Sequence, residues 1–198
     1  MNKISVFLRF SLLFEMTFIA ILPVKSWGAP KLSFFKENIT FTICAQDTIE
    51  VHGIYWFSNT GDDSISTYIT YPFPIDSNAA YPYYIVVAQS DTHKTVAYQK
   101  FSRGISWRQS VPARGFDSVS VVYRQKVKKG CGQYIVSTTK LWGKPLQKAN
   151  FTVRVPRRIT MIFWTFQADS VTTTNDTILY HSYFNSFLPD GEMEVHWR

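Results

Sequence analysis

The sequence predicts an all-β fold, an antiparallel β-sandwich of about ten strands in a single domain. Three observations support this prediction. Aromatic residues make up 17% of the 198 residues, and aromatic side chains favour sheet over helix. Short apolar or alternating runs are separated by Gly, Pro, Asn and Asp, which are typical turn residues. No segment has a convincing helical period, although one helical turn is expected within residues 141–149.

The strand-like runs begin after residue 31. Ile39, Phe41 and Ile43 alternate with polar residues, which indicates a strand with one buried face. Residues 49–57 are apolar on both faces and therefore indicate a central strand. Further strands are expected at residues 65–71, 83–88, 95–101, 105–109, 119–123, 134–139, 151–155, 159–166, 178–184 and 193–197.

Residues 1–28 have the features of an export signal. Lys3 and Arg9 precede an apolar stretch at residues 10–24, and small residues follow at the expected cleavage position after Gly28. We therefore expect a signal peptide at 1–28 and a β-sandwich domain at 29–198. The mature protein would be periplasmic or extracellular, with no transmembrane span. The alternative is an uncleaved N-terminal anchor, although Glu15 within the apolar stretch weakens both readings.

The formal net charge of +7 is a mild basic excess. Part of it belongs to the export signal, and part is a local basic run within residues 124–129 that is typical of a solvated hairpin end. Nucleic-acid binding is therefore not predicted for this exported chain.

The chain contains two cysteines, Cys44 and Cys131, each in or beside an expected strand. In an oxidising compartment they could form one disulfide that joins distant strands. Two free thiols are the alternative. Their wide separation in sequence excludes a CxxC redox or zinc motif.

Several aromatic and proline motifs resemble a known family. They are residues 53–60, 71–76, 105–107, 121–125, 134–139, 142–146 and 151–153. Together they resemble an exported bacterial β-sandwich family of unknown function (DUF4424-like) over most of residues 48–198. The order of these motifs is also distantly similar to the domains shared by vault proteins and inter-α-trypsin inhibitors. The resemblance implies an exported β-sandwich and no particular reaction.

The sequence shows no catalytic signature. The four histidines lack helical metal-ligand spacing, and no Gly-x-Ser-x-Gly motif is present. Most acidic residues lie at turn positions, where Asp is favoured for its hydrogen bonds to the local backbone. We therefore predict a protein that is not an enzyme and that carries no metal or cofactor.

The candidate binding residues are aromatic. Five of them lie within residues 71–84, and one lies beside a Gly-Lys-Pro turn: Tyr71, Phe73, Tyr81, Tyr83, Tyr84 and Trp142. If at least three of these rings are exposed together, they would stack on sugars or anchor a partner protein. The alternative is that they fill the core of the sandwich.

These observations predict a non-enzymatic exported module of the cell envelope with a structural or protein-recognition role and an unidentified protein partner. The alternative function is a carbohydrate-binding module that uses the aromatic cluster. A third hypothesis, a hydrolase with an unfamiliar site, requires a deep pocket with two carboxylates or with a histidine beside a nucleophile.

Overall fold

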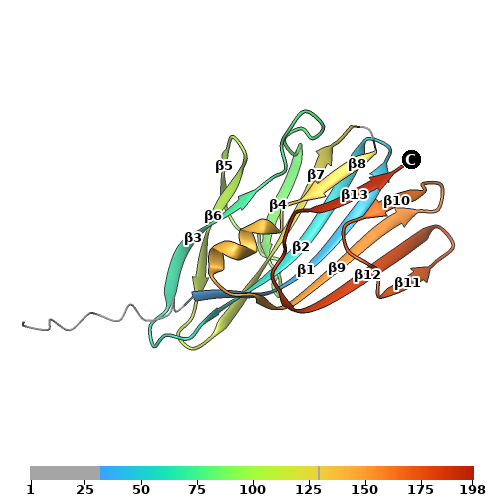
Figure 1. Cartoon of the computed structure of the whole chain (residues 1–198). Coiled ribbons are helices and arrows are strands. Elements are labelled where there is room, and N and C mark those ends of the chain that lie inside the picture. The colour runs from blue at the N-terminus through green and yellow to red at the C-terminus, as the bar shows by residue number, and fades with distance from the viewer. Residues whose placement is uncertain (1–31, 129) are drawn as a thin grey trace, which may run out of the picture.

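The computed structural model describes residues 32–128 and 130–198 (Figure 1). The predicted signal peptide at residues 1–28 lies outside these residues. The regular structure of the described residues is strand apart from one short 3₁₀ helix, so the prediction of an all-β fold is confirmed. Within this part of the chain, no helix has the length and apolar character that crossing a membrane requires.

The described residues form strands that are numbered here in chain order. They are β1 (Leu32–Ala45), β2 (Thr48–Asn59), β3 (Ile65–Pro72), β4 (Tyr84–Gln89), β5 (Tyr98–Phe101), β6 (Gly104–Val111), β7 (Phe116–Lys126), β8 (Cys131–Tyr134), β9 (Leu146–Pro156), β10 (Met161–Trp164), β11 (Ser170–Thr173), β12 (Thr177–Phe187) and β13 (Met193–Trp197). The 3₁₀ helix η1 (Ser137–Trp142) lies between β8 and β9.

The strands form three sheets (Figure 1). The largest has seven strands in the order β11-β12-β9-β1-β2-β7-β4, and two three-stranded sheets have the orders β10-β13-β8 and β3-β6-β5. The pair β1–β9 is parallel, with Lys36 opposite Lys148 and Thr42 opposite Arg154. The prediction of a purely antiparallel sheet is therefore wrong at this pair. A parallel pair needs a long crossover, which the intervening strands β2 to β8 provide.

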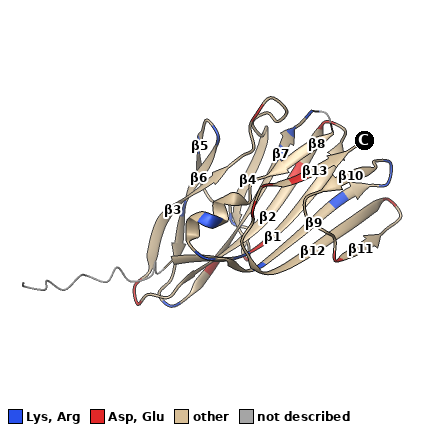
Figure 2. Cartoon of the chain, in the orientation of Figure 1, with Lys and Arg blue, Asp and Glu red and all other residues tan. Residues whose placement is uncertain are grey.

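One hydrophobic core cluster contains residues from all three sheets. Ile39, Phe41 and Ile43 of β1 are buried on the inner face of the large sheet, as their alternation predicts. The expected central strand 49–57 is β2, which lies between β1 and β7. Figure 2 shows Lys and Arg at separate places on loops and strands rather than in one basic patch on this side of the described chain.

The connection from β3 to β4 is irregular, and a buried side chain of β7 anchors it by hydrogen bonds. Phe73 is fully buried, and the buried Gln125 side chain of β7 lies against the connection. Its Nε2 donates hydrogen bonds to the carbonyl oxygens of Pro74, at 2.8 Å, and Ala80, at 2.7 Å. These bonds give a donor to two backbone carbonyls in a segment that has left the sheet.

The strand expected at residues 134–139 ends earlier, because β8 stops at Tyr134 and η1 begins at Ser137. The Glu192 carboxylate accepts hydrogen bonds from the backbone N–H groups of Val136, at 2.7 Å, and Ser137, at 3.1 Å. These donors have no partner within a helix, so a distant residue stabilises the helix start. Gly143 ends the helix with a left-handed φ of 71°.

The predicted disulfide is wrong, and the alternative of two free thiols agrees with the structure. Cys44 lies on the outer face of β1. Burial raises the pKa of its thiol; the nearby Glu50 adds to this rise and Arg124 opposes it. Cys131 lies on the outer face of β8, with Sγ 3.7 Å from Nε2 of His196. The two cysteines lie on strands of different sheets, and both are partly buried.

We expect Gln125→Ala to lower the free energy of unfolding by about 2 kcal/mol, because it removes the donor to the buried Pro74 carbonyl and to the partly buried Ala80 carbonyl. Urea unfolding measures this change. The matched control is Gln99→Ala, which removes an exposed glutamine of β5 and should change stability by less than about 0.5 kcal/mol. Equal losses in the two variants would contradict the role given to Gln125.

Candidate functional site

A cavity of about 640 Å³, here called the aromatic cavity, lies over β1 and β2 of the large sheet. One side is formed by β3 and β6 of one small sheet. The opposite side is formed by the end of β8 and by η1. Figure 1 shows η1 over the large sheet, between β3 and β8, and residues of η1 line the cavity.

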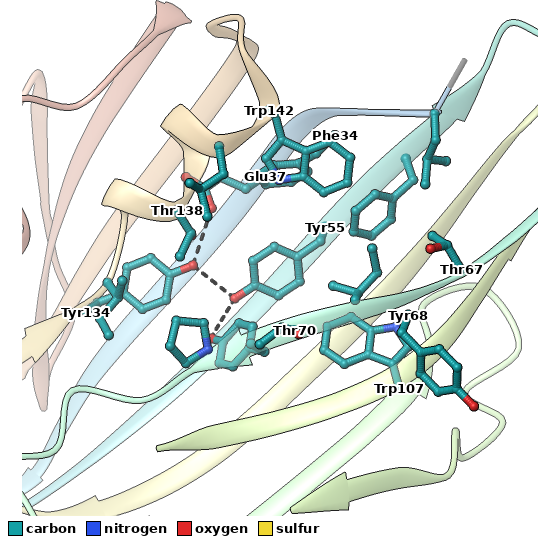
Figure 3. Close-up of a pocket in the computed structure, with 17 residues that line it drawn as sticks. Phe34, Glu37, Tyr55, Thr67, Tyr68, Thr70, Trp107, Tyr134, Thr138 and Trp142 are labelled. Atoms are coloured by element: carbon teal, nitrogen blue, oxygen red, sulfur yellow. Dashed lines mark hydrogen bonds between the residues drawn. The ribbon is translucent and has the colours of Figure 1, made fainter. Parts of the chain in front are cut away.

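Aromatic rings line this cavity on every side. Phe34 and Phe57 come from the large sheet, and each packs against Trp142 of η1, with ring centroids 5.9 Å and 5.8 Å apart. Trp107 of β6 and Tyr68 of β3 lie across the cavity from these rings (Figure 3). Rings and apolar side chains predominate in ligand-binding cavities, where a few polar groups set the orientation of the ligand.

A chain of hydrogen bonds crosses the floor of the aromatic cavity (Figure 3). The Tyr55 hydroxyl lies 2.9 Å from the Tyr71 hydroxyl and 3.1 Å from that of Tyr134. Tyr134 donates to Oε2 of Glu37 at 3.3 Å. The chain thus joins β1, β2, β3 and β8 through side chains alone.

Gly53 makes room for this chain of hydrogen bonds. A Cβ atom at Gly53 would lie 1.9 Å from the Tyr55 hydroxyl oxygen and 2.3 Å from the carbon that bears it. The Tyr55 side chain thus lies back along its own strand, over a residue that has no side chain. The sequence Gly-Ile-Tyr sets the position of the central hydroxyl.

Glu37 is the acidic residue of the aromatic cavity, and it is only 2% exposed. Burial raises the pKa of its carboxyl from 4.5 to about 8, although the hydrogen bond from Tyr134 opposes this rise. The carboxyl is therefore mainly protonated at neutral pH. Its Oε1 atom is buried and has no hydrogen-bond partner.

Burial also raises the pKa values of Tyr55, Tyr71 and Tyr134 above the ordinary tyrosine value. All three hydroxyls therefore keep their protons at any physiological pH, and each can act as a hydrogen-bond donor. Each hydroxyl has only one proton to donate, and these bonds already engage the three groups with one another and with Oε2. Oε1 of Glu37 is thus the carboxyl oxygen that receives no hydrogen bond from these tyrosines.

The lining of the aromatic cavity suits binding better than hydrolysis. Glu37 is the single carboxyl among the described lining residues, whereas most glycoside hydrolases use two. Neither a histidine nor a cysteine occurs among these lining residues. The third hypothesis, hydrolysis, therefore lacks its required groups in this cavity.

A cysteine, a histidine and a glutamate do meet elsewhere, on the outer face of β8 and β13. Nε2 of His196 lies 3.7 Å from Sγ of Cys131 and 3.3 Å from Oε2 of Glu194. Both contacts use the same nitrogen, whereas a catalytic histidine uses one nitrogen for the nucleophile and the other for the carboxylate. Burial raises the pKa of the Cys131 thiol, which disfavours a reactive thiolate. In the described chain, no cluster of three metal-ligating side chains was found.

The structure divides the predicted aromatic cluster among different environments. Tyr71 and Trp142 line the aromatic cavity, and Phe73 lies fully in the core. Tyr81 is half-buried, and its hydroxyl donates to the Gly104 carbonyl at 2.9 Å.

Tyr83 and Tyr84 are the exposed pair of this cluster, at 59% and 44%. The Arg124 guanidinium lies 5.2 Å from the centre of the Tyr84 ring. The condition of three rings exposed together is therefore not met, and the alternative of core packing holds for Tyr71 and Phe73, which the Pro-Phe-Pro crossing turns into the core.

Glu37, Tyr55 and Tyr134 were not among the predicted site residues. A signal for Glu37 exists, because it is two residues before Ile39 and shares its phase with Ile39 and Phe41. Extending the alternation of Ile39 and Phe41 back by two residues would have placed the Glu37 carboxyl on the buried face. The partners of Glu37 carry no comparable signal, since they come from other strands.

No family model matches this chain, and no curated protein matches it significantly. Among solved structures, a candidate nutrient-binding protein from Legionella pneumophila is similar, with a TM-score of 0.65 and 14% identity over 85% of this chain and 67% of that chain. A variant of the M1 zinc metallopeptidase from Deinococcus radiodurans, bound to a peptide substrate, has a TM-score of 0.51 and 10% identity. The match covers 84% of this chain but only 42% of the peptidase. At these identities the similarity shows the fold alone.

We expect the stability of the protein to fall as pH rises from about 4.5 to about 8, through Glu37. The raised pKa means that the folded protein binds more protons than the unfolded chain in this range, so ionisation favours unfolding. The contribution approaches about 1.4 kcal/mol per pH unit. Urea unfolding of wild type and Glu37→Gln at several pH values measures it, and the variant should lack this slope. Parallel pH profiles would show that Glu37 is ionised in the folded protein.

Gly53→Ala and Tyr55→Ala should be strongly non-additive. Gly53→Ala alone forces the Tyr55 ring from its place and should cost about 1–3 kcal/mol of unfolding free energy. In a Tyr55→Ala background the added methyl has space, so the cost of Gly53→Ala should drop by at least about 1 kcal/mol. Chemical denaturation of the two single variants and the double variant tests this coupling. Simple additivity would place the strain somewhere other than the Tyr55 ring.

Proposed function

We propose that this protein is an exported, non-enzymatic recognition module of the cell envelope whose aromatic cavity binds a small ligand with an apolar body. The observation that carries the proposal is a cavity of about 640 Å³ that is lined by aromatic rings and contains one buried carboxyl with an unpartnered oxygen. The proposal includes a single β-sandwich domain, supported by the core cluster that all three sheets share.

Export is supported by the signal-like pattern of residues 1–28, and the periplasm or the extracellular space is the proposed location. The non-enzymatic role is supported by the composition of the cavity lining, in which the single carboxyl lacks a catalytic partner. The Legionella protein of similar fold is described as a candidate nutrient-binding protein. That description is compatible with a binding role for the present chain.

The composition of the lining favours an apolar ligand over a sugar. A sugar presents many hydroxyl groups, and each needs a partner when it leaves water. The three tyrosine hydroxyls at the floor of the cavity are already bonded to one another. Carbohydrate binding is therefore retained as the alternative ligand class rather than as the leading one.

A protein partner is the second candidate, and one edge of the large sheet supports it. Strand β11 is the last strand of this sheet, and all four of its residues are exposed. An exposed edge strand offers backbone hydrogen-bonding groups to an added strand of a partner. This mode of binding would leave the aromatic cavity empty.

A ligand panel tests the leading proposal. The panel contains aromatic ammonium compounds, neutral aromatic alcohols, fatty acids and disaccharides, and the readouts are thermal unfolding and the fluorescence of Trp107 and Trp142. A compound present at about a hundred times its Kd should raise the free energy of unfolding by about 2.7 kcal/mol.

Thr138→Trp fills part of the aromatic cavity and should abolish this stabilisation. Thr172→Trp is the matched control, since it adds the same ring on the exposed strand β11 and should leave ligand binding unchanged. If no member of the panel stabilises the wild-type protein, or if Thr138→Trp responds like the wild type, the cavity is not the ligand site.

A further inference from the structure

We propose that the aromatic cavity selects organic cations, and that a primary ammonium group on an apolar or aromatic body binds against Oε1 of Glu37. This inference rests on the proposed function, which assigns ligand binding to the same cavity. It adds the chemical class of the ligand and the residue that recognises the charge.

The first argument is geometric. Glu37 lines the cavity, and its two carboxyl oxygens have different surroundings. Oε2 accepts the hydrogen bond from Tyr134, whereas Oε1 is buried without any partner. Once Glu37 is ionised, Oε1 is a buried acceptor without a partner, which costs about 1–3 kcal/mol or more, and a ligand that supplies an N–H donor removes this cost.

The second argument concerns charge. The described lining residues include no Lys, Arg or His, so the protein supplies no cation of its own to Glu37. The adjacent Lys36 does not serve, because its ammonium lies on the outer face of the sheet, 4.2 Å from the centre of the Trp56 ring. The ionised form of Glu37 therefore needs a cation from outside the protein.

The third argument is the aromatic lining. The faces of aromatic rings carry negative electrostatic potential and attract ammonium groups within about 6 Å. Figure 3 shows the rings of Trp142 and Phe34 beside Glu37, with Tyr55 and Tyr134 at the floor. Rings and a carboxyl together suit a cation with an apolar body. An anionic ligand would meet no Lys, Arg or His side chain among the described lining residues.

Proton release follows from this arrangement. In the empty cavity Glu37 is mainly protonated below pH 8, and an ammonium group favours its ionised form. Binding therefore expels a proton, and the affinity for the cation should fall about tenfold for each pH unit below 8. Tyr134, Tyr55 and Tyr71 face Glu37 from β8, β2 and β3, and burial keeps their pKa values above the ordinary value. These tyrosines contribute no titration in this range.

The decisive experiment compares phenethylammonium with the neutral 2-phenylethanol by isothermal titration calorimetry at pH 6, 7 and 8. The amine keeps its charge throughout this range, as a lysine side chain does. We expect the amine to bind at least tenfold more tightly than the alcohol at pH 8, and its affinity to fall towards pH 6. Titrations in two buffers of different ionisation enthalpy should show the release of close to one proton at pH 7.

Glu37→Gln should reduce the affinity for the amine more than tenfold at pH 8 and remove its pH dependence, with the affinity for the alcohol changed less than twofold. Glu50→Gln is the matched control, because Glu50 pairs with Arg124 on the outer face of the neighbouring strand. It should leave both affinities unchanged. The pH dependence of the wild-type protein tests the inference even if Glu37→Gln folds poorly.

The outcomes separate the two proposals. If the alcohol binds as tightly as the amine and Thr138→Trp abolishes both, the cavity binds ligands but does not select cations, and this inference fails alone. If the amine binds without proton release, Glu37 does not recognise the charge and the inference fails. If neither compound binds and no member of the wider ligand panel binds, both the proposed function and this inference are wrong.

Discussion

The alternation of β1 is the constraint on which the candidate site depends. Once Ile39 and Phe41 enter the core, the period of two also places Glu37 on the buried face. A one-residue slip that freed the carboxyl would expose the apolar residues after it. The core therefore holds Glu37 in place, and the two small sheets cover the large sheet on either side of it. The aromatic cavity is the region between them.

The tyrosine chain shows how this cavity is held open. Tyr55 reaches its place only because Gly53 has no side chain, and its hydroxyl bonds to Tyr71 and Tyr134, which come from two different small sheets or their ends. Apolar residues at these positions would allow the small sheets to approach and fill the space. Mutually bonded hydroxyls keep a fixed spacing instead, because each proton is already committed and the network is lost if one member moves.

The sequence was sufficient for the fold class and for most strands, because periodicity and turn residues are local. It was insufficient for the parallel pair β1–β9 and for the start of η1, which depends on Glu192 from a distant turn. The exposed strand β11 has no buried residue, so it gave no apolar signal. Of the predicted site residues, Tyr71 and Trp142 do line the cavity. A single sequence does not show which rings a loop crossing turns inward, so it left open that Phe73 lies in the core while Tyr83 and Tyr84 are exposed.

The burial of Glu37 reduces stability, and this explains why a carboxyl there indicates function. A protonated acid in an aromatic cavity with one unpartnered oxygen is less favourable for folding than an apolar side chain of similar volume. Proteins keep such groups mainly where a ligand or a reaction uses them, which is why strongly shifted pKa values gather at functional sites. In the proposed complex, a cationic ligand would favour the ionised form of Glu37 and pair with Oε1. Under this proposal, the same carboxyl lowers the stability of the empty protein and strengthens the binding of a cation.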